Sequence, residues 1–249
     1  MDSLIRFNAQ TTGREKLLRL CQFTSRMVWS LLMKYKPNDE SIDKFQDLES
    51  KLSSSRKLLR LGRCIDALYS SLQTMHLPDP TLRVTLTVSR IANSLYLLCD
   101  HMVWLASTGL ISVNGKQWSE WSNKFWLYSI AMNLTRDIYE ISNILKFSLT
   151  FNKNNINQNY YYEHSSRFDG NQTNLINSSK AQYLKIIEWI IKHKIICIDT
   201  FKNFCDLWIP LTSLGHTKLS PQTIGFLGLF SSLIAILQIY NYSYRLSPS

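Results

Sequence analysis

Glycine and proline are scarce in this chain, with eight glycines and six prolines among 249 residues. An all-β fold needs turn residues after each short strand, so this scarcity disfavours one. The sequence also has no phosphate-binding loop, dinucleotide fingerprint or nucleophile-elbow motif. We therefore predict an all-α protein that is not an enzyme and has no catalytic residues.

Cysteine and histidine form no pattern that would hold a metal. The five cysteines are widely spaced and include no C-x-x-C pair. This spacing disfavours a disulfide framework or a zinc site and favours a reducing compartment. The five histidines are scattered along the chain. No metal and no cofactor is predicted.

The net charge is +10 at pH 7, and the isoelectric point is about 9.4. Such a balance indicates a phosphate-bearing partner, either nucleic acid or anionic lipid. The basic stretch has no aromatic residues between its charges, which disfavours nucleic acid. The mean hydropathy of −0.12 is too low for a protein made mainly of membrane spans, although one or two spans would fit.

Residues 54–76 carry the most informative pattern. Apolar residues recur there at steps of three and four, which places them on one stripe of a helix: Leu58, Leu61, Ile65, Leu68, Leu72 and Met75. Gly62 could end the helix as a C′ residue, but the period stays in phase across it, so one unbroken helix is expected. Basic residues accompany the stripe, with the arginines on the opposite side: Arg56, Lys57, Arg60 and Arg63. The spacing alone fits a helix on an anionic membrane, a helix in a partner's groove or a core seam of a soluble bundle.

Helical patterns also precede and follow this segment. A helix is expected from Thr12 to about Lys34, with Thr12 and Glu15 forming a capping box, and another from about Glu40 to Lys51. A kink or a short turn is expected at residues 53–55. An Asn-rich stretch at 151–180 predicts a disordered linker between a helical region, 1–150, and a C-terminal region, 181–249.

Residues 224–240 contain no charge, and with their neighbours, about 223–242, they are long enough to span a membrane. A buried core helix is the alternative interpretation. Small residues four positions apart give this segment a weak self-association face: Gly228, Ser231, Ser232 and Ala235. A second candidate span, 91–113, contains Asp100 and His101, and an intramembrane aspartate is costly unless it is paired.

Several blocks in a fixed order resemble one known family. They are RFNAQ at 6–10, REKL at 14–17, LESKL at 48–52, SRKLLRLG at 55–62, YLLCD at 96–100, MNLTRDIYEI at 132–141, CDLWIPL at 205–211 and GFLGL at 225–229. Nearly end to end, the chain resembles the peroxisomal biogenesis factor 11 family, and the Asn-rich stretch is where it departs.

The resemblance implies an integral peroxisomal membrane protein that elongates the membrane and promotes peroxisome fission and proliferation. It implies self-association, a peroxisomal membrane-protein import receptor, a fission adaptor and a dynamin-related GTPase as partners. Together with the terminal span, it favours insertion of the stripe into an anionic phospholipid membrane, with the four basic residues binding headgroups. A pore for small metabolites is the alternative. The predicted fold is thus a helical membrane protein with amphipathic surface helices and a C-terminal transmembrane helix.

Overall fold

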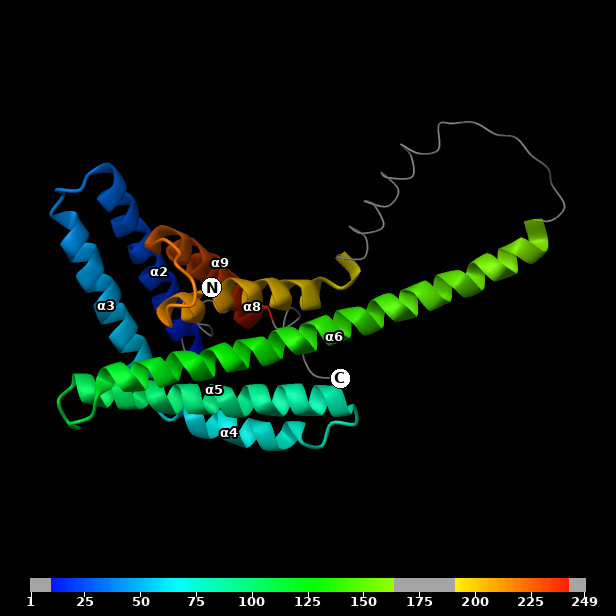
Figure 1. Cartoon of the computed structure of the whole chain (residues 1–249), viewed down its shortest axis with the longest axis horizontal. Coiled ribbons are helices and arrows are strands. Elements are labelled where there is room, and N and C mark those ends of the chain that lie inside the picture. The colour runs from blue at the N-terminus through cyan, green and yellow to red at the C-terminus, as the bar shows by residue number, and fades with distance from the viewer. Residues whose placement is uncertain (1–9, 164–190, 242–249) are drawn as a thin grey trace.

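The computed structural model describes residues 10–163 and 191–241, and the side chains of 10–146 and 191–241. Every regular element in these ranges is a helix, which confirms the all-α prediction (Figure 1). The helices are α2 (Thr11–Tyr35), α3 (Ser41–Leu59), α4 (Arg63–Thr74), α5 (Pro80–Ser107), α6 (Gly115–Glu163), α8 (Lys194–Ser213) and α9 (Pro221–Tyr240).

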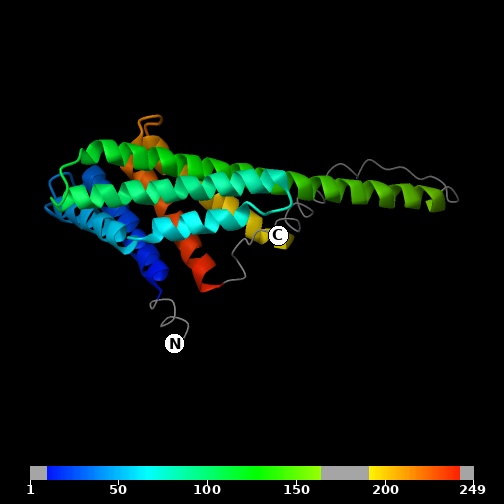
Figure 2. The same ribbon diagram turned by 90° about the horizontal axis from the view of Figure 1, so that it is seen from below.

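Helices α4, α5 and α6 run side by side in an extended layer, with α5 between the other two (Figures 1 and 2). A second group packs on this layer, in which α2 packs against α3 and α9, and α8 packs against α6 and α9. A small apolar cluster of Phe23, Ile209 and Ile224 joins α2, α8 and α9. Most other fully buried side chains are polar or charged, so the apolar surface of several helices faces outward.

The start of α5 follows directly from its sequence. The Asp79 carboxylate accepts hydrogen bonds from the backbone N–H groups of Thr81 and Leu82, at 2.8 and 3.4 Å. Pro80 occupies the first helical position, where a missing N–H costs nothing. Ser220 and Pro221 begin α9 in the same way.

The predicted continuous helix through Gly62 is wrong. Helix α3 ends at Leu59, and Gly62 adopts a left-handed conformation with φ of 80° before α4 begins at Arg63. Glycine takes this conformation without the steric cost of a Cβ atom. The alternative of a short turn at 53–55 is also wrong, because α3 runs through those residues.

Two further expectations need correction. Gln10 is the N-cap of α2 and makes no side-chain cap bond, and Glu15 is buried with an ion-pair partner on α3, so the capping box does not form. Helix α6 continues to Glu163 into the range predicted as a linker. Once a helix is formed, adding residues costs far less than starting one, so moderately helical polar residues can extend it. Residues 164–180 of that range lie outside the described residues.

The close approach of α9 to α2 depends on Gly228. A Cβ atom added there would lie 2.3 Å from the buried ring of Phe23. We expect Gly228→Ala to destabilise the protein by about 1–3 kcal/mol through overpacking. Gly115→Ala is the matched control, because its Cβ would meet Ala106 at an ordinary 3.7 Å. Thermal unfolding in detergent, followed by the helical circular dichroism signal, measures both. Equal melting temperatures for the two variants would contradict the prediction.

Candidate membrane-contact surface and basic interior

Helix α4 is packed with its polar side inward. Ser71 and Thr74 are each 2% exposed, whereas the six stripe residues predicted from the spacing are between 47% and 70% exposed. Leu58 and Leu61 precede the break at Gly62 and are exposed like the four residues that follow it. Water would select the opposite arrangement, because burial of apolar surface drives folding. This face of the molecule is therefore built for an apolar environment.

Polar contacts hold α4 in this orientation on α5. Ser94 Oγ donates to the carbonyl oxygen of Cys64 at 2.7 Å, and Thr87 Oγ1 donates to Thr74 Oγ1 at 3.0 Å. Arg90 donates to the carbonyl oxygen of Ser70. These hydrogen bonds attach the polar face of α4 to α5. The apolar stripe of α4 therefore stays exposed.

Arg56 and Arg60 do not face headgroups, and the prediction that they do is wrong. Arg56 donates to the Glu15 carboxylate, with an Nη2–Oε1 distance of 2.9 Å, and to Gln22 at 2.5 Å. Arg60 is 7% exposed, and its Nη2 lies 2.8 Å from Asp100 Oδ2. Both guanidinium groups lie inside the bundle because the side of the helix opposite the apolar stripe faces other helices.

This buried network fixes the point where α3 ends. Besides Asp100, Arg60 donates to the Tyr96 hydroxyl, and its own carbonyl oxygen lies 2.8 Å from His101 Nε2. Burial acts to raise the pKa of Glu15, but Lys16, Arg56 and Arg60 outweigh it and hold that pKa well below its usual range. Glu15 is therefore ionised at neutral pH and links α2 to the end of α3.

Lys57 and Arg63 remain candidates for binding anions. Both are half-buried, and neither forms an ion pair with an acidic residue in the part of the chain whose side chains are described. Each lines a cavity in the bundle, Arg63 near the start of α2 and Lys57 between α3 and α5. Their headgroup contact stays a prediction.

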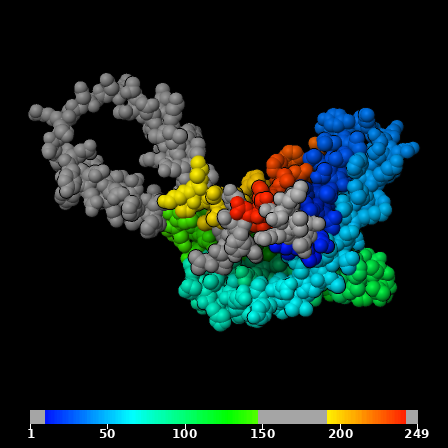
Figure 3. Space-filling view, turned by 180° about the vertical axis from the view of Figure 1, so that it is seen from behind, coloured from blue at the N-terminus to red at the C-terminus, as the bar shows by residue number. Residues whose placement is uncertain are grey.

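A second apolar stripe, on α5, was not recognised in the sequence. Its members are between 37% and 59% exposed: Val84, Val88, Ile91, Leu95 and Leu98. The stripe points away from α6, because Ser89 on the other side of α5 bonds to Asn133 of α6 at 2.7 Å. Figure 3 shows α4 and α5 side by side along one edge of the molecule. The five stripe residues recur at steps of four and three, and this spacing is the signal that predicts them.

The candidate span is confirmed in position, whereas its predicted self-association face is not free. Helix α9 is the one helix among the described residues that is long and apolar enough to cross a membrane. Gly228, Ser231, Ser232 and Ala235 are buried inside the chain, where Ser231 Oγ donates to Asp206 at 2.5 Å. The outward side of α9 is apolar and 40–56% exposed: Phe226, Phe230, Leu233 and Leu237. The second candidate, 91–113, does not qualify, and Asp100 within it pairs with Arg60.

Asp199 carries a second buried network that links α6 to α8. Its carboxylate accepts from Arg136 at 2.6 Å, from Lys202 and from Gln238 at 3.1 Å. Burial would raise the pKa of Asp199, but Lys202 and Arg136 lower it to about 2. The charged carboxylate therefore stabilises the fold above the unfolded pKa near 3.8, and this contribution is lost as the pH falls through about 2.

We expect the wild-type chain to lose about 2 kcal/mol of stability between pH 5 and pH 2 relative to Asp199→Asn. Subtracting the free energy of unfolding of Asp199→Asn from that of the wild type at each pH removes the contributions of other carboxylates that titrate in the same range. Chemical denaturation in detergent, followed by tryptophan fluorescence at each pH, measures it. Parallel pH profiles for the two proteins would contradict the assignment.

Comparisons with known proteins agree over the whole chain. The family model described as peroxisomal biogenesis factor 11 matches residues 1–240. The chain is 32% identical to peroxisomal membrane protein 11B of Homo sapiens, over 100% of both chains, and 32% identical to peroxisomal membrane protein 11A of Bos taurus, over 96% of both. It is 28% identical to peroxisomal membrane protein PMP30B of Candida boidinii, over 96% of this chain and 93% of the relative. No solved structure matches it.

Proposed function

Because the chain belongs to the peroxisomal biogenesis factor 11 family, we propose that it elongates the peroxisomal membrane by inserting the apolar stripe of α4, and so promotes fission and proliferation of the organelle. The chain is a peroxisomal membrane protein that acts in peroxisome biogenesis. One candidate span, α9, fits its association with the membrane.

The inverted polarity of α4 carries the proposal. A helix that buries Ser71 and Thr74 while exposing Ile65, Leu68 and Leu72 requires something apolar on its outer face. Amphipathic helices lie in the membrane interface with the apolar side about 5–10 Å deep. Insertion to that depth into one leaflet expands this leaflet relative to the other, and this favours positive curvature.

The apolar side chains supply most of the energy of insertion. Full burial of one aliphatic side chain contributes roughly 1.5–3 kcal/mol, so six partly buried ones contribute on the order of 5–10 kcal/mol before ordering costs. Lys57 and Arg63 would add about 1 kcal/mol each on anionic lipid. Arg56 and Arg60 contribute nothing at the surface, because they pair inside the bundle. The charge thus selects the lipid, and the apolar stripe holds the helix.

The proposed partners are inferred from the family resemblance. Self-association would concentrate many weak insertions in one tubule, and a fission adaptor with a dynamin-related GTPase would complete division. A membrane-protein import receptor would deliver the chain to the organelle. No enzymatic step is part of the proposal.

Reconstitution of the full chain into vesicles of anionic phospholipid tests the function. Electron microscopy should show tubules in these vesicles. Vesicles of phosphatidylcholine alone that contain the same density of protein should stay round. Vesicles that stay spherical in anionic lipid, with the chain inserted through α9, would contradict the proposal.

A pore for small metabolites is the second candidate. Three polar cavities inside the bundle favour it, with charged residues such as Arg19 and Asp206 in their walls. Leakage of a small solute from the same reconstituted vesicles separates the two functions. Tubules without leakage support insertion alone, whereas leakage without tubules supports the pore.

A further inference from the structure

Adjoining cavities in the middle of the bundle have strongly basic walls. Their volumes are about 510, 200 and 290 Å³. Lys16, Arg19 and Arg63 line both of the first two. Arg19, Arg56 and Arg60 line both of the last two. The three cavities are therefore neighbours, and Arg19 lines all of them.

Positive charge exceeds negative charge in this region. Eight cationic side chains line the cavities: Lys16, Arg19, Arg26, Arg56, Lys57, Arg60, Arg63 and Lys202. Five carboxylates pair with them: Glu15, Glu49, Asp100, Asp199 and Asp206. Three positive charges are thus not balanced by these carboxylates. Charge removed from bulk water is costly unless an opposite charge accompanies it.

Arg19 supplies the strongest indication of a ligand. Its side chain is 6–7% exposed, and its Nη2 donates to Asp206. Its buried Nε has no hydrogen-bond acceptor among the described residues. A buried donor without an acceptor costs about 1–3 kcal/mol, so an acceptor is expected beside it. Arg63, on the same cavity wall, has no acidic partner in the described part of the chain either.

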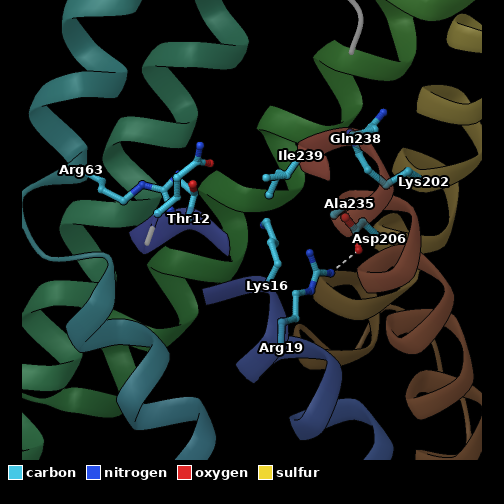
Figure 4. Close-up of a pocket in the computed structure, with 10 residues that line it drawn as sticks. Thr12, Lys16, Arg19, Arg63, Lys202, Asp206, Ala235, Gln238 and Ile239 are labelled. Carbon is cyan, nitrogen blue, oxygen red and sulfur yellow. Dashed lines mark hydrogen bonds and ion pairs between the residues drawn. The ribbon is translucent and has the colours of Figure 1, made fainter. Parts of the chain in front are cut away.

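The largest of the three cavities lies beside the last turn of α9. Gln238 and Ile239, from the last turn of α9, form one wall, and Thr12 and Lys16 from the start of α2 form another (Figure 4). If α9 spans the bilayer, its last turn lies near the phospholipid headgroups, because the ends of a span meet the interface. Arg63 reaches the same cavity from the start of α4.

We propose that this cavity binds the phosphate group of an anionic ligand, with Lys16, Arg19 and Arg63 as its cationic contacts. A phosphate carries up to two negative charges, which suits the excess of positive charge in the region. Guanidinium groups match phosphate oxygens in a bidentate geometry. A phosphorylated lipid headgroup and a soluble phosphate share this chemistry. The site is separate from the apolar stripe, and Arg63, at the start of α4, is the one residue that it shares with the headgroup contacts of the proposed function.

The protonation of Lys16 provides a specific readout. Glu15 raises its pKa, but burial and the neighbouring guanidinium groups lower it to about 8. A bound phosphate would raise this pKa again, so binding takes up a proton and weakens above pH 8. The charged groups that face Lys16 from α2, α3, α4 and α8 are Glu15, Arg19, Arg56, Arg63, Lys202 and Asp206.

The test uses the full chain in detergent and follows its melting temperature. One arm titrates inorganic phosphate against chloride at matched ionic strength. The other arm titrates dihexanoyl phosphatidic acid against dihexanoyl phosphatidylcholine. We expect Arg63→Gln and Lys16→Gln each to weaken binding about tenfold. Lys44→Gln, an exposed lysine on α3, is the matched control and should bind like the wild type.

The two arms identify the source of the phosphate. Stronger stabilisation by phosphatidic acid than by inorganic phosphate assigns a lipid headgroup, and equal stabilisation assigns a soluble phosphate; both support the site. The proposal is overturned if neither ligand exceeds its control or if Arg63→Gln and Lys16→Gln respond like Lys44→Gln. No vesicle is deformed in this experiment, so its failure and a failure of membrane elongation are separate results.

Discussion

Vesicles reconstituted with the double variant Leu68→Asp and Leu72→Asp are expected to remain round. Both leucines lie on the outer face of α4, at 52% and 54% exposure. Removing them withdraws about 2–3 kcal/mol of apolar burial from insertion. The two added carboxylates would also meet anionic lipid, which repels them. Electron microscopy of the vesicles, beside the wild-type chain, measures the loss of tubules.

The fold itself should not change, because neither leucine packs in the interior. Melting temperatures of the double variant and the wild type in detergent are therefore expected to agree. Leu110→Asp is the matched control, since Leu110 is 72% exposed in the turn between α5 and α6 and lies outside both stripes. Tubules that persist in the double variant, or that vanish equally with Leu110→Asp, would refute the role of α4.

Replacing Arg60 with methionine is expected to cause the largest loss of stability. Arg60 and Asp100 are each less than a tenth exposed, and their nearest atoms lie 2.8 Å apart. Removing one partner leaves a buried charge uncompensated, which costs about 3–5 kcal/mol. The Tyr96 hydroxyl also loses its guanidinium partner. Thermal unfolding in detergent measures the effect.

Two controls separate the buried pair from a general effect of lost charge. Lys51→Met breaks an exposed pair with Asp47, whose side chains are 73% and 62% exposed, and should cost less than about 1 kcal/mol. Arg60→Met combined with Asp100→Leu removes both charges and should recover most of the stability. If Arg60→Met costs no more than Lys51→Met, the interior network does not hold α3 and α5 together.

The helices and the exposed stripe could be predicted from periodicity, whereas the break at Gly62 was indicated by the glycine itself and not by the period. An apolar period reports which side chains share a face, and here that face continues on both sides of the turn. Leu58 and Leu61 before the turn are exposed like Ile65 and Leu68 after it. The positive φ at Gly62 is a property of the backbone that side-chain spacing does not record.

The roles of Arg56 and Arg60 depended on tertiary structure. Spacing placed them opposite the apolar stripe, and this position faces water on an isolated helix. In the folded chain the same side faces Glu15 and Asp100, which are distant in the sequence. The small residues of α9 were predicted to mediate self-association, but they pack inside the chain, where Phe23 of α2 lies against Gly228. Pairwise spacing cannot identify a partner that comes from another helix.

The depth of the α4 stripe in the membrane tests the central claim most directly. A spin label can be placed by Leu68→Cys, or by Asp66→Cys as the control, in the reconstituted full chain with its five cysteines replaced. We predict that the label at 68 collides more often with oxygen than with a water-soluble nickel chelate, and that the label at 66 shows the reverse. Equal access of the nickel chelate to both positions would show that α4 does not enter the bilayer.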